Sequence, residues 1–279
     1  MSECGVYQVL NCKLPPPSGK LCPEAIDQWA RRTGDPDGRI LAKWIREGAP
    51  LGIKRDIELS GIFPPIDPGG LRDPASLSCD VLRWANYTSA EDSPAVVLDL
   101  LREQEQKGHC KFFDSEAGLS NFLGGREFQL SKLALITKIR PNGDTKHRLV
   151  WDLTASKVNE AISLGERVVL PRLADAVDDT LAVHSQAPVG SEVEYLAIDI
   201  ADAFHNVPLH TSEQPFATAL VGGTFVAFTA LAMGSRSAPG VWGRFAAFLG
   251  RFVAATCQQF NLRTEIYVDD PLLVTAGPL

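Results

Sequence analysis

Apolar residues recur at two different spacings, and the spacing changes near residue 130. Ahead of that point, PEAIDQWARR (23–32) and DGRILAKWIREG (37–48) carry apolar residues three and four positions apart, as amphipathic helices do. A third helix is predicted at 94–108, which begins with proline and ends with glycine. The first 20 residues indicate a tail or linker, and FPPIDPGGLRDP (63–74) indicates a loop.

Beyond residue 130 the pattern is typical of strands. KLALITKIR (132–140) and KHRLVWDL (146–153) flank the turn PNGD and predict an antiparallel hairpin that bears several basic side chains. Strands are then expected at 192–200, 264–268 and 272–275, a hairpin at 217–230, and helices at 170–184, 201–206 and 241–260. The last helix carries an apolar stripe that we expect to lie against a sheet, formed by Trp242, Phe245, Phe248, Leu249, Phe252 and Val253.

These elements predict an α+β fold, with helices that back an antiparallel sheet. Residues 1–130 are expected to form a helical, loop-rich N-terminal extension, and residues 131–279 a second domain. The chain of 279 residues is 45% hydrophobic and 22% charged, which is typical of globular proteins.

The uncharged stretch 216–235 is long enough to span a bilayer. However, Gly222 and Gly223 lie at its middle between β-rich segments, which favours a hairpin with a Gly-Gly turn over a membrane helix. The six cysteines form no CxxC pair and have no His at zinc-ligand spacing. The first 20 residues contain no apolar h-region after a basic start, which argues against a secretory signal. We therefore expect free thiols and an intracellular protein, cytoplasmic or nuclear.

The net charge is −7, and charged residues are unevenly distributed along the sequence. Residues 131–172 carry eight Lys and Arg against four Asp and Glu, whereas residues 173–279 carry four against eleven. This indicates either a phosphate site that faces metal-binding carboxylates or chance clustering on a solvated surface.

Three aspartates follow apolar strands. Asp199 ends YLAID, and Asp269 and Asp270 follow IYV about 70 residues later. Taken alone, Asp-Asp after a strand favours an ordinary turn. Two such strand ends side by side would bring three carboxylates to one rim, which suits Mg²⁺.

Four blocks in order resemble the fingers and palm of retroelement, retrotransposon-type reverse transcriptases. They are KHRLVWDLTASKVN (146–159), LAIDIADAFHNVPL (196–209), FTALAMGSRSAPGVWGRF (228–245) and YVDD (267–270). The resemblance implies an RNA-directed DNA polymerase, a nucleotidyltransferase that uses two Mg²⁺ ions, with Mn²⁺ as a substitute, a primed RNA or DNA template, and dNTPs. Its metal set would be Asp199, Ile200, Asp269 and Asp270, with the three aspartates catalytic.

The same resemblance implies nucleotide contacts. Arg148 would pair with triphosphate oxygens, supported by Lys146 and by Arg140 or Lys138. The turn at Asp202 and Ala203 would receive phosphate oxygens, and Phe204 would exclude a ribose 2′-hydroxyl. Met233 stands where many relatives carry Gln, and Gly234 and Pro239 would shape the template-side loop.

Two further departures concern the end of the sequence. Pro271 removes a backbone donor next to the Asp pair. The sequence ends nine residues after Asp270, so a thumb and an RNase H domain find no counterpart in it and would come from a longer polyprotein. The early end favours one alternative, a truncated, catalytically dead remnant that binds nucleic acid or a partner. An RNA-dependent RNA polymerase shares the palm logic and is another alternative, against which Phe204 and Val268 argue.

Overall fold

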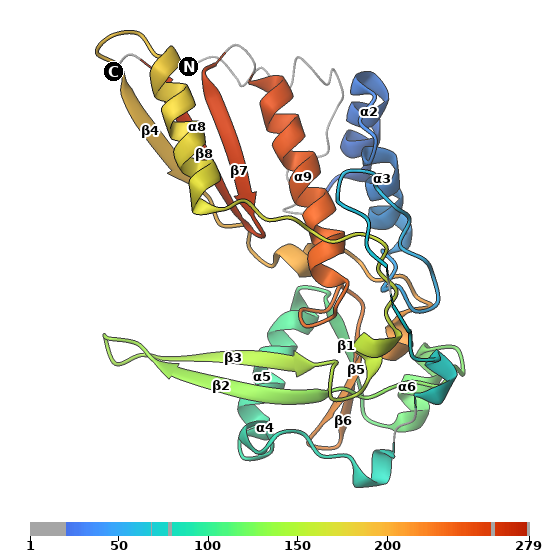
Figure 1. The fold of residues 1–279 in the computed structure, drawn as a ribbon. Helices are drawn as coiled ribbons and strands as arrows, with labels where there is room; N and C mark the ends of the chain where they lie inside the picture. The colour runs from blue at the N-terminus through green and yellow to red at the C-terminus, as the bar shows by residue number, and fades with distance from the viewer. Residues whose placement is uncertain (1–20, 68, 78–79, 258–259, 278–279) are drawn as a thin grey trace.

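The computed structural model describes residues 21–67, 69–77, 80–257 and 260–277. Figure 1 shows an elongated molecule with a sheet near each end and a long hairpin that projects from the lower part. The fold is α+β, as predicted, with small antiparallel sheets. The expected tail at 1–20 lies outside the described residues.

The upper sheet has the strand order β4-β8-β7 and is antiparallel throughout. Its strands are β4 (Glu192–Ala197), β7 (Leu262–Tyr267) and β8 (Asp270–Gly277). Two helices, α8 (Leu173–Gln186) and α9 (Ala238–Thr256), pack against it, as the sequence predicted. In Figure 1 the end of β4 and the turn of the β7–β8 hairpin point toward the half of the molecule that contains β2 and β3.

The apolar stripe of α9 was assigned to the wrong partner in part. Phe252 contacts Trp29 of α2 (Pro23–Thr33) with ring centroids 4.6 Å apart, and Phe245 lies 6.4 Å from Trp44 of α3 (Gly38–Glu47). On the sheet side, Gly250 lies beside Ile266 of β7. Phe252 and Phe245 therefore join α9 to the N-terminal helices.

The lower sheet combines both halves of the sequence. Strand β1 (Cys110–Phe113) pairs with β6 (Thr224–Phe228), which pairs with β5 (Thr218–Val221). The β5–β6 hairpin was predicted, and Gly222 and Gly223 make its turn with φ of 55° and 81°. No helix among the described residues is long and apolar enough to cross a membrane.

The hairpin of β2 (Lys132–Ile139) and β3 (Thr145–Asp152) forms a sheet of its own. The remaining described helices are α4 (Thr88–Glu91), α5 (Pro94–Gln106), α6 (Glu116–Phe122) and α7 (Val158–Ala161). Short 3₁₀ turns lie at 74–76, 81–83, 203–206 and 214–216.

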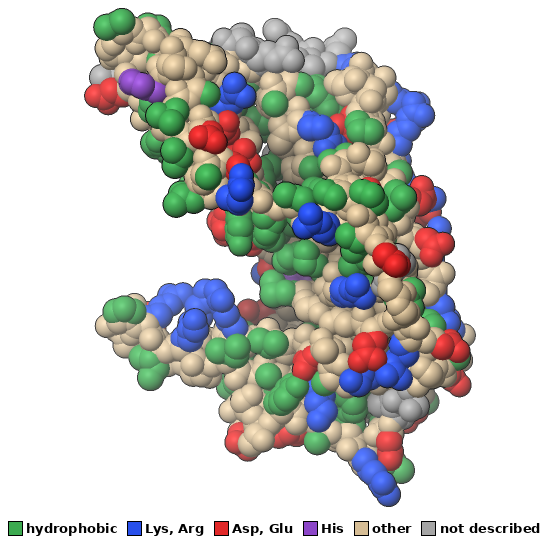
Figure 2. Space-filling view, in the orientation of Figure 1, with side chains coloured by type: hydrophobic (Ala, Val, Ile, Leu, Met, Phe, Trp, Pro, Cys, Tyr) green, Lys and Arg blue, Asp and Glu red, His purple; other side chains and the backbone are tan. Residues whose placement is uncertain are grey.

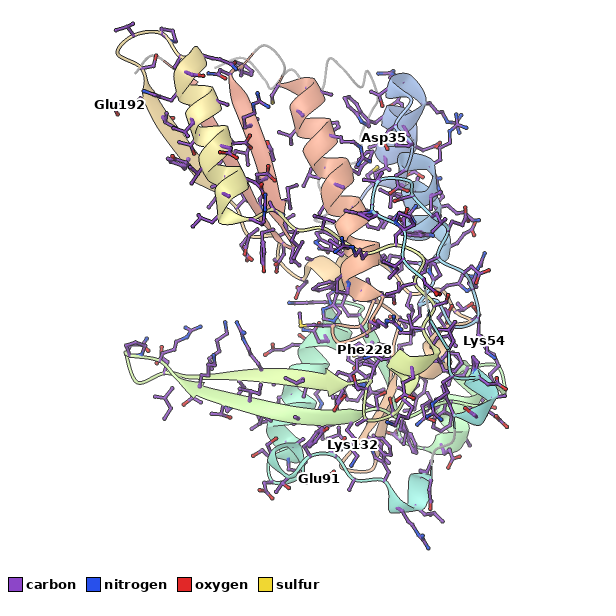
Figure 3. The ribbon with its side chains drawn as sticks, viewed as in Figure 1. Asp35, Lys54, Glu91, Lys132, Glu192 and Phe228 are labelled. Atoms are coloured by element: carbon purple, nitrogen blue, oxygen red, sulfur yellow. The ribbon has the colours of Figure 1, made fainter. Side chains whose placement is uncertain are left out.

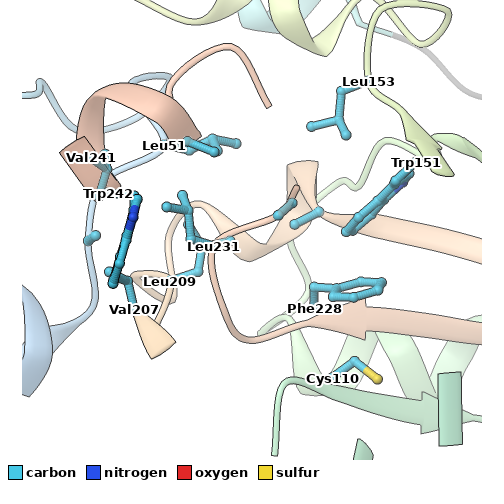
Figure 4. Packing of buried hydrophobic residues seen from close by; sticks show 14 of the residues in the cluster. Leu51, Cys110, Trp151, Leu153, Val207, Leu209, Phe228, Leu231, Val241 and Trp242 are labelled. Atoms are coloured by element: carbon cyan, nitrogen blue, oxygen red, sulfur yellow. The ribbon is translucent and has the colours of Figure 1, made fainter. Parts of the chain in front are cut away.

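One hydrophobic cluster links the two halves of the chain. It contains Leu41 and Leu101 from the first 130 residues together with Trp151, Leu231 and Trp242 from the rest. Figure 4 shows part of this packing around Trp151, Phe228 and Trp242. The described part of the N-terminal segment therefore shares a core with the rest of the chain. The division into two domains at residue 130 stays a prediction.

Three cysteines lie in the described segments, Cys22, Cys110 and Cys257, and all three are free thiols. Burial raises the pKa of the Cys110 thiol to about 12. Cys4, Cys12 and Cys79 lie outside the described residues. Intracellular location stays a prediction.

Candidate functional site

The ends of β4 and the β7–β8 hairpin lie side by side. The ladder between β4 and β8 continues past Ala197, since the amide of Ile198 donates to the Pro271 carbonyl at 2.9 Å and that of Ile200 to the Asp269 carbonyl at 2.8 Å. This register places Asp199 directly opposite Asp270, between those two hydrogen bonds. Facing residues at such a position have Cα atoms about 4.5 Å apart and point to the same side. The expected convergence of the two strand ends is therefore present in the backbone.

The turn that carries Asp269 has a strained backbone and is held by a hydrogen bond from Trp242. Val268 and Asp269 form the two-residue loop between Tyr267 and Asp270, and Val268 has φ of 58°, which is rare for a β-branched residue. The indole N–H of buried Trp242 donates to the Val268 carbonyl at 2.6 Å. Pro271 has no N–H to donate. It fits near the start of β8 because its carbonyl accepts the hydrogen bond from β4.

Among the described residues, the three aspartates have no cationic partner. Asp199 and Asp270 are exposed and Asp269 is half-buried, and within the described parts of the chain no Lys or Arg forms an ion pair with them. Facing like charges on neighbouring strands destabilise a sheet. Among the described residues, no Lys or Arg at ion-pair distance offsets this repulsion.

The donor set suits a hard cation only in part. Two carboxylates share one side of the sheet, which fits the oxygen ligands that Mg²⁺ takes. However, the described residues contain no group of three or more His, Cys, Asp or Glu side chains arranged to hold a metal ion. Asp269 is linked to the end of β4 by its carbonyl, which accepts from the Ile200 amide. The metal set of three aspartates stays a proposal. Ile200 lies at the same rim and packs on the main core.

The predicted phosphate-binding side chains share one face of the β2–β3 hairpin. Lys138 pairs with Lys146, Arg148 lies opposite Ile136, and the Arg140 amide donates to the Asp144 carbonyl, so all four basic side chains fall on the same side. All four are exposed. Figure 2 shows Lys and Arg gathered along the hairpin where it borders a hollow, across which the upper sheet ends. The side-chain sticks of Figure 3 rise from this edge into the same space.

The segment after Asp199 is a tight turn followed by a 3₁₀ turn, η3 (Ala203–Asn206). Asp202 adopts a left-handed conformation with φ of 53°, and its carboxylate accepts from Lys107 Nζ at 2.7 Å. This hydrogen bond holds the pKa of Asp202 below its usual value. Ala203 is buried, and Phe204 is half-buried and packs on the main core.

The template-side loop contains the other predicted residues. Met233 is 57% exposed. Gly234 has φ of 105°, and a Cβ there would lie 2.4 Å from the Trp151 carbonyl oxygen, so the position requires glycine. Its carbonyl accepts from Asn159 Nδ2 at 3.1 Å, and Pro239 lies in the first turn of α9.

Sequence reasoning missed three residues of this region. Lys107 contacts the turn after Asp199 from 95 residues away, Asn159 binds the Gly234 loop, and Trp242 was expected only to pack. Lys107 lies in the N-terminal segment, outside the four motif blocks. Lone polar residues of this kind carry no local signal in a single sequence.

The chain is similar to known proteins at the level of solved structures. No protein-family model matches the sequence, and no curated protein matches it significantly. Among solved structures, the chain is similar to the native prototype foamy virus protease–reverse transcriptase, with a TM-score of 0.43 and 16% identity over 68% of this chain. The CSH mutant of that viral protein gives a TM-score of 0.42, also at 16% identity. The match spans 20% of each viral chain.

Proposed function

We propose that this chain is the fingers and palm of an RNA-directed DNA polymerase from a retroelement. The observation that carries the proposal is the pairing of Ile200 with Asp269, which sets Asp199 opposite Asp270 at one rim of the upper sheet. A basic hairpin face lies across the hollow from this rim. Carboxylates on one side and guanidinium and ammonium groups on the other suit a metal-bound triphosphate.

In this proposal Asp199, Asp269 and Asp270 hold two Mg²⁺ ions, with Ile200 at the same rim. The ions supply activation of the primer 3′-hydroxyl and neutralisation of the leaving pyrophosphate. The chain's own contribution is position: the β4–β8 pairing and the Trp242 contact fix the aspartates, while Arg148, Lys146 and Arg140 orient the triphosphate. Arg148 does this through the planar fork that binds two phosphate oxygens at once.

Phe204 provides a test of substrate class. Replacing Phe204 with Ala is expected to raise incorporation of NTPs relative to dNTPs by about tenfold, which corresponds to about 1.4 kcal/mol of lost steric discrimination. The proposed reason is that the ring occupies the space that a ribose 2′-hydroxyl needs. Single-nucleotide extension of a primer on an RNA template, with each nucleotide type in turn, measures the ratio.

Phe260→Ala serves as the control, because this ring is 60% exposed and belongs to none of the four motif blocks. An unchanged ratio in Phe204→Ala would remove the sugar-selection role. A wild-type chain that prefers NTPs would instead support an RNA-dependent RNA polymerase.

A second candidate function is nucleic-acid binding without catalysis. It is favoured by the lack of a gathered three-carboxylate metal set among the described side chains. Retention of a primed template together with no extension under Mg²⁺ or Mn²⁺ would support this remnant and contradict the polymerase. Template-dependent extension would reject it.

A further inference from the structure

The connection between α5 and β1 contacts the turn that separates Asp199 from Phe204. Lys107 Nζ lies 2.7 Å from Asp202 Oδ2, and the two side chains are 49% and 31% exposed. Lys107 lies outside the four polymerase-like blocks, so this contact comes from the N-terminal segment.

Asp202 in this turn sits at φ 53°, ψ 32°, a left-handed region that Asp enters more readily than most L residues but that remains sparsely populated. The Asn206 amide donates to the Asp202 carbonyl at 3.0 Å, so the orientation of Asp202 sets the start of η3 and with it the direction of Phe204. A charge-assisted hydrogen bond to the side chain is a strong means of holding such a residue.

The residues next to Lys107 are themselves fixed. The Thr229 amide donates to the His109 carbonyl at 2.9 Å, and the Thr229 hydroxyl donates to the Gly108 carbonyl at 3.0 Å. The His109 ring stacks on His205 of η3 with centroids 5.0 Å apart. Lys107 therefore extends from a segment that is tied both to the end of β6 and to the turn that it contacts.

We propose that Lys107 is a positioning residue that holds the Asp202 turn and so sets the sugar selectivity of Phe204. This inference rests on the proposed polymerase function. Lys107 acts through Asp202 and does not itself touch the nucleotide.

The test compares Lys107→Met with Lys107→Arg in the full chain, and uses Lys111→Met as the matched control. Lys111 lies four residues away on β1, where its ammonium group sits over the Phe122 ring. Hydrogen–deuterium exchange is followed in peptides that cover 200–208. Primer extension then gives the ratio of dNTP to NTP incorporation.

Lys107→Met is expected to speed exchange at 200–208 and to lower the dNTP preference about fivefold, equivalent to about 1 kcal/mol. Lys107→Arg, which keeps the cationic donor, should restore most of both, and Lys111→Met should change neither. Unchanged exchange in Lys107→Met overturns the inference whether or not the chain polymerises. Faster exchange with an unchanged dNTP-to-NTP ratio in an active chain also overturns the inference. A wild-type chain that extends no primer refutes the proposed function, and the exchange result then decides whether Lys107 holds the Asp202 turn.

Discussion

Replacing Asp199 with Asn is expected to reduce Mg²⁺-dependent primer extension about a thousandfold, which corresponds to about 4 kcal/mol of lost transition-state stabilisation. The carboxylate is proposed to help bind the ions that the reaction needs, and an amide oxygen carries no charge to do so. Folding should not suffer. Asp199 faces Asp270, and removal of one of two like charges relieves repulsion between neighbouring strands.

Steady-state extension rates and urea unfolding of the same preparations measure the two effects. Glu194→Gln is the matched control, because Glu194 is an exposed acid on the same strand whose loss should leave extension unchanged. An Asp199→Asn chain that extends primers at the wild-type rate would remove Asp199 from the site. A chain that loses activity only because it unfolds would show the loss in both measurements.

Replacing Arg244 with Met is expected to lower the free energy of unfolding by about 3–5 kcal/mol. The Arg244 guanidinium is 2% exposed and pairs with Asp37, which is fully buried. It also donates to the Glu58 carbonyl at 2.6 Å and lies 4.4 Å from the centroid of the Trp44 ring. Methionine fills much of the space but leaves the Asp37 carboxylate buried without its partner.

Urea denaturation followed by tryptophan fluorescence measures this loss. Arg102→Met provides the comparison, since the Arg102–Asp99 pair is exposed on α5 and such pairs contribute about 0–1 kcal/mol. Equal stability losses in the two variants would mean that the buried pair does not join α9 to the N-terminal helices as strongly as its burial implies. Should Arg244→Met fail to fold at all, Asp37→Asn keeps the test open with a milder change.

Local patterns were sufficient for most elements of the fold. The helices at 23–32, 37–48 and 94–108 and the two hairpins follow from apolar spacing and turn residues, and all are present. The pairing of β1 with β6 was not foreseen, because it joins residues more than a hundred positions apart through a strand of only four residues. For the same reason the sequence placed the α9 stripe against the sheet alone. Its contacts with Trp29 and Trp44 join residues far apart in the sequence.

The candidate site divides in the same way. Each aspartate was found from the strand that precedes it, and the β-sheet register then brings Asp199 and Asp270 face to face. Contacts such as Lys107 with Asp202 and Arg244 with Asp37 depend on side chains that meet only in the folded chain, 95 and 207 residues apart. No periodicity or spacing encodes them.

Divalent-cation binding at the rim tests the central claim most directly. Mn²⁺ is titrated into the full chain with a chain-terminated primer on its template and the next dNTP, and bound metal is followed by electron paramagnetic resonance. We expect Asp199→Asn and Asp270→Asn each to weaken Mn²⁺ binding at least about tenfold, because loss of even an outer-shell partner costs that much at metal sites. Glu194→Gln should bind Mn²⁺ as the wild type does. Equal Mn²⁺ affinity in all four proteins would contradict a metal site between these strand ends.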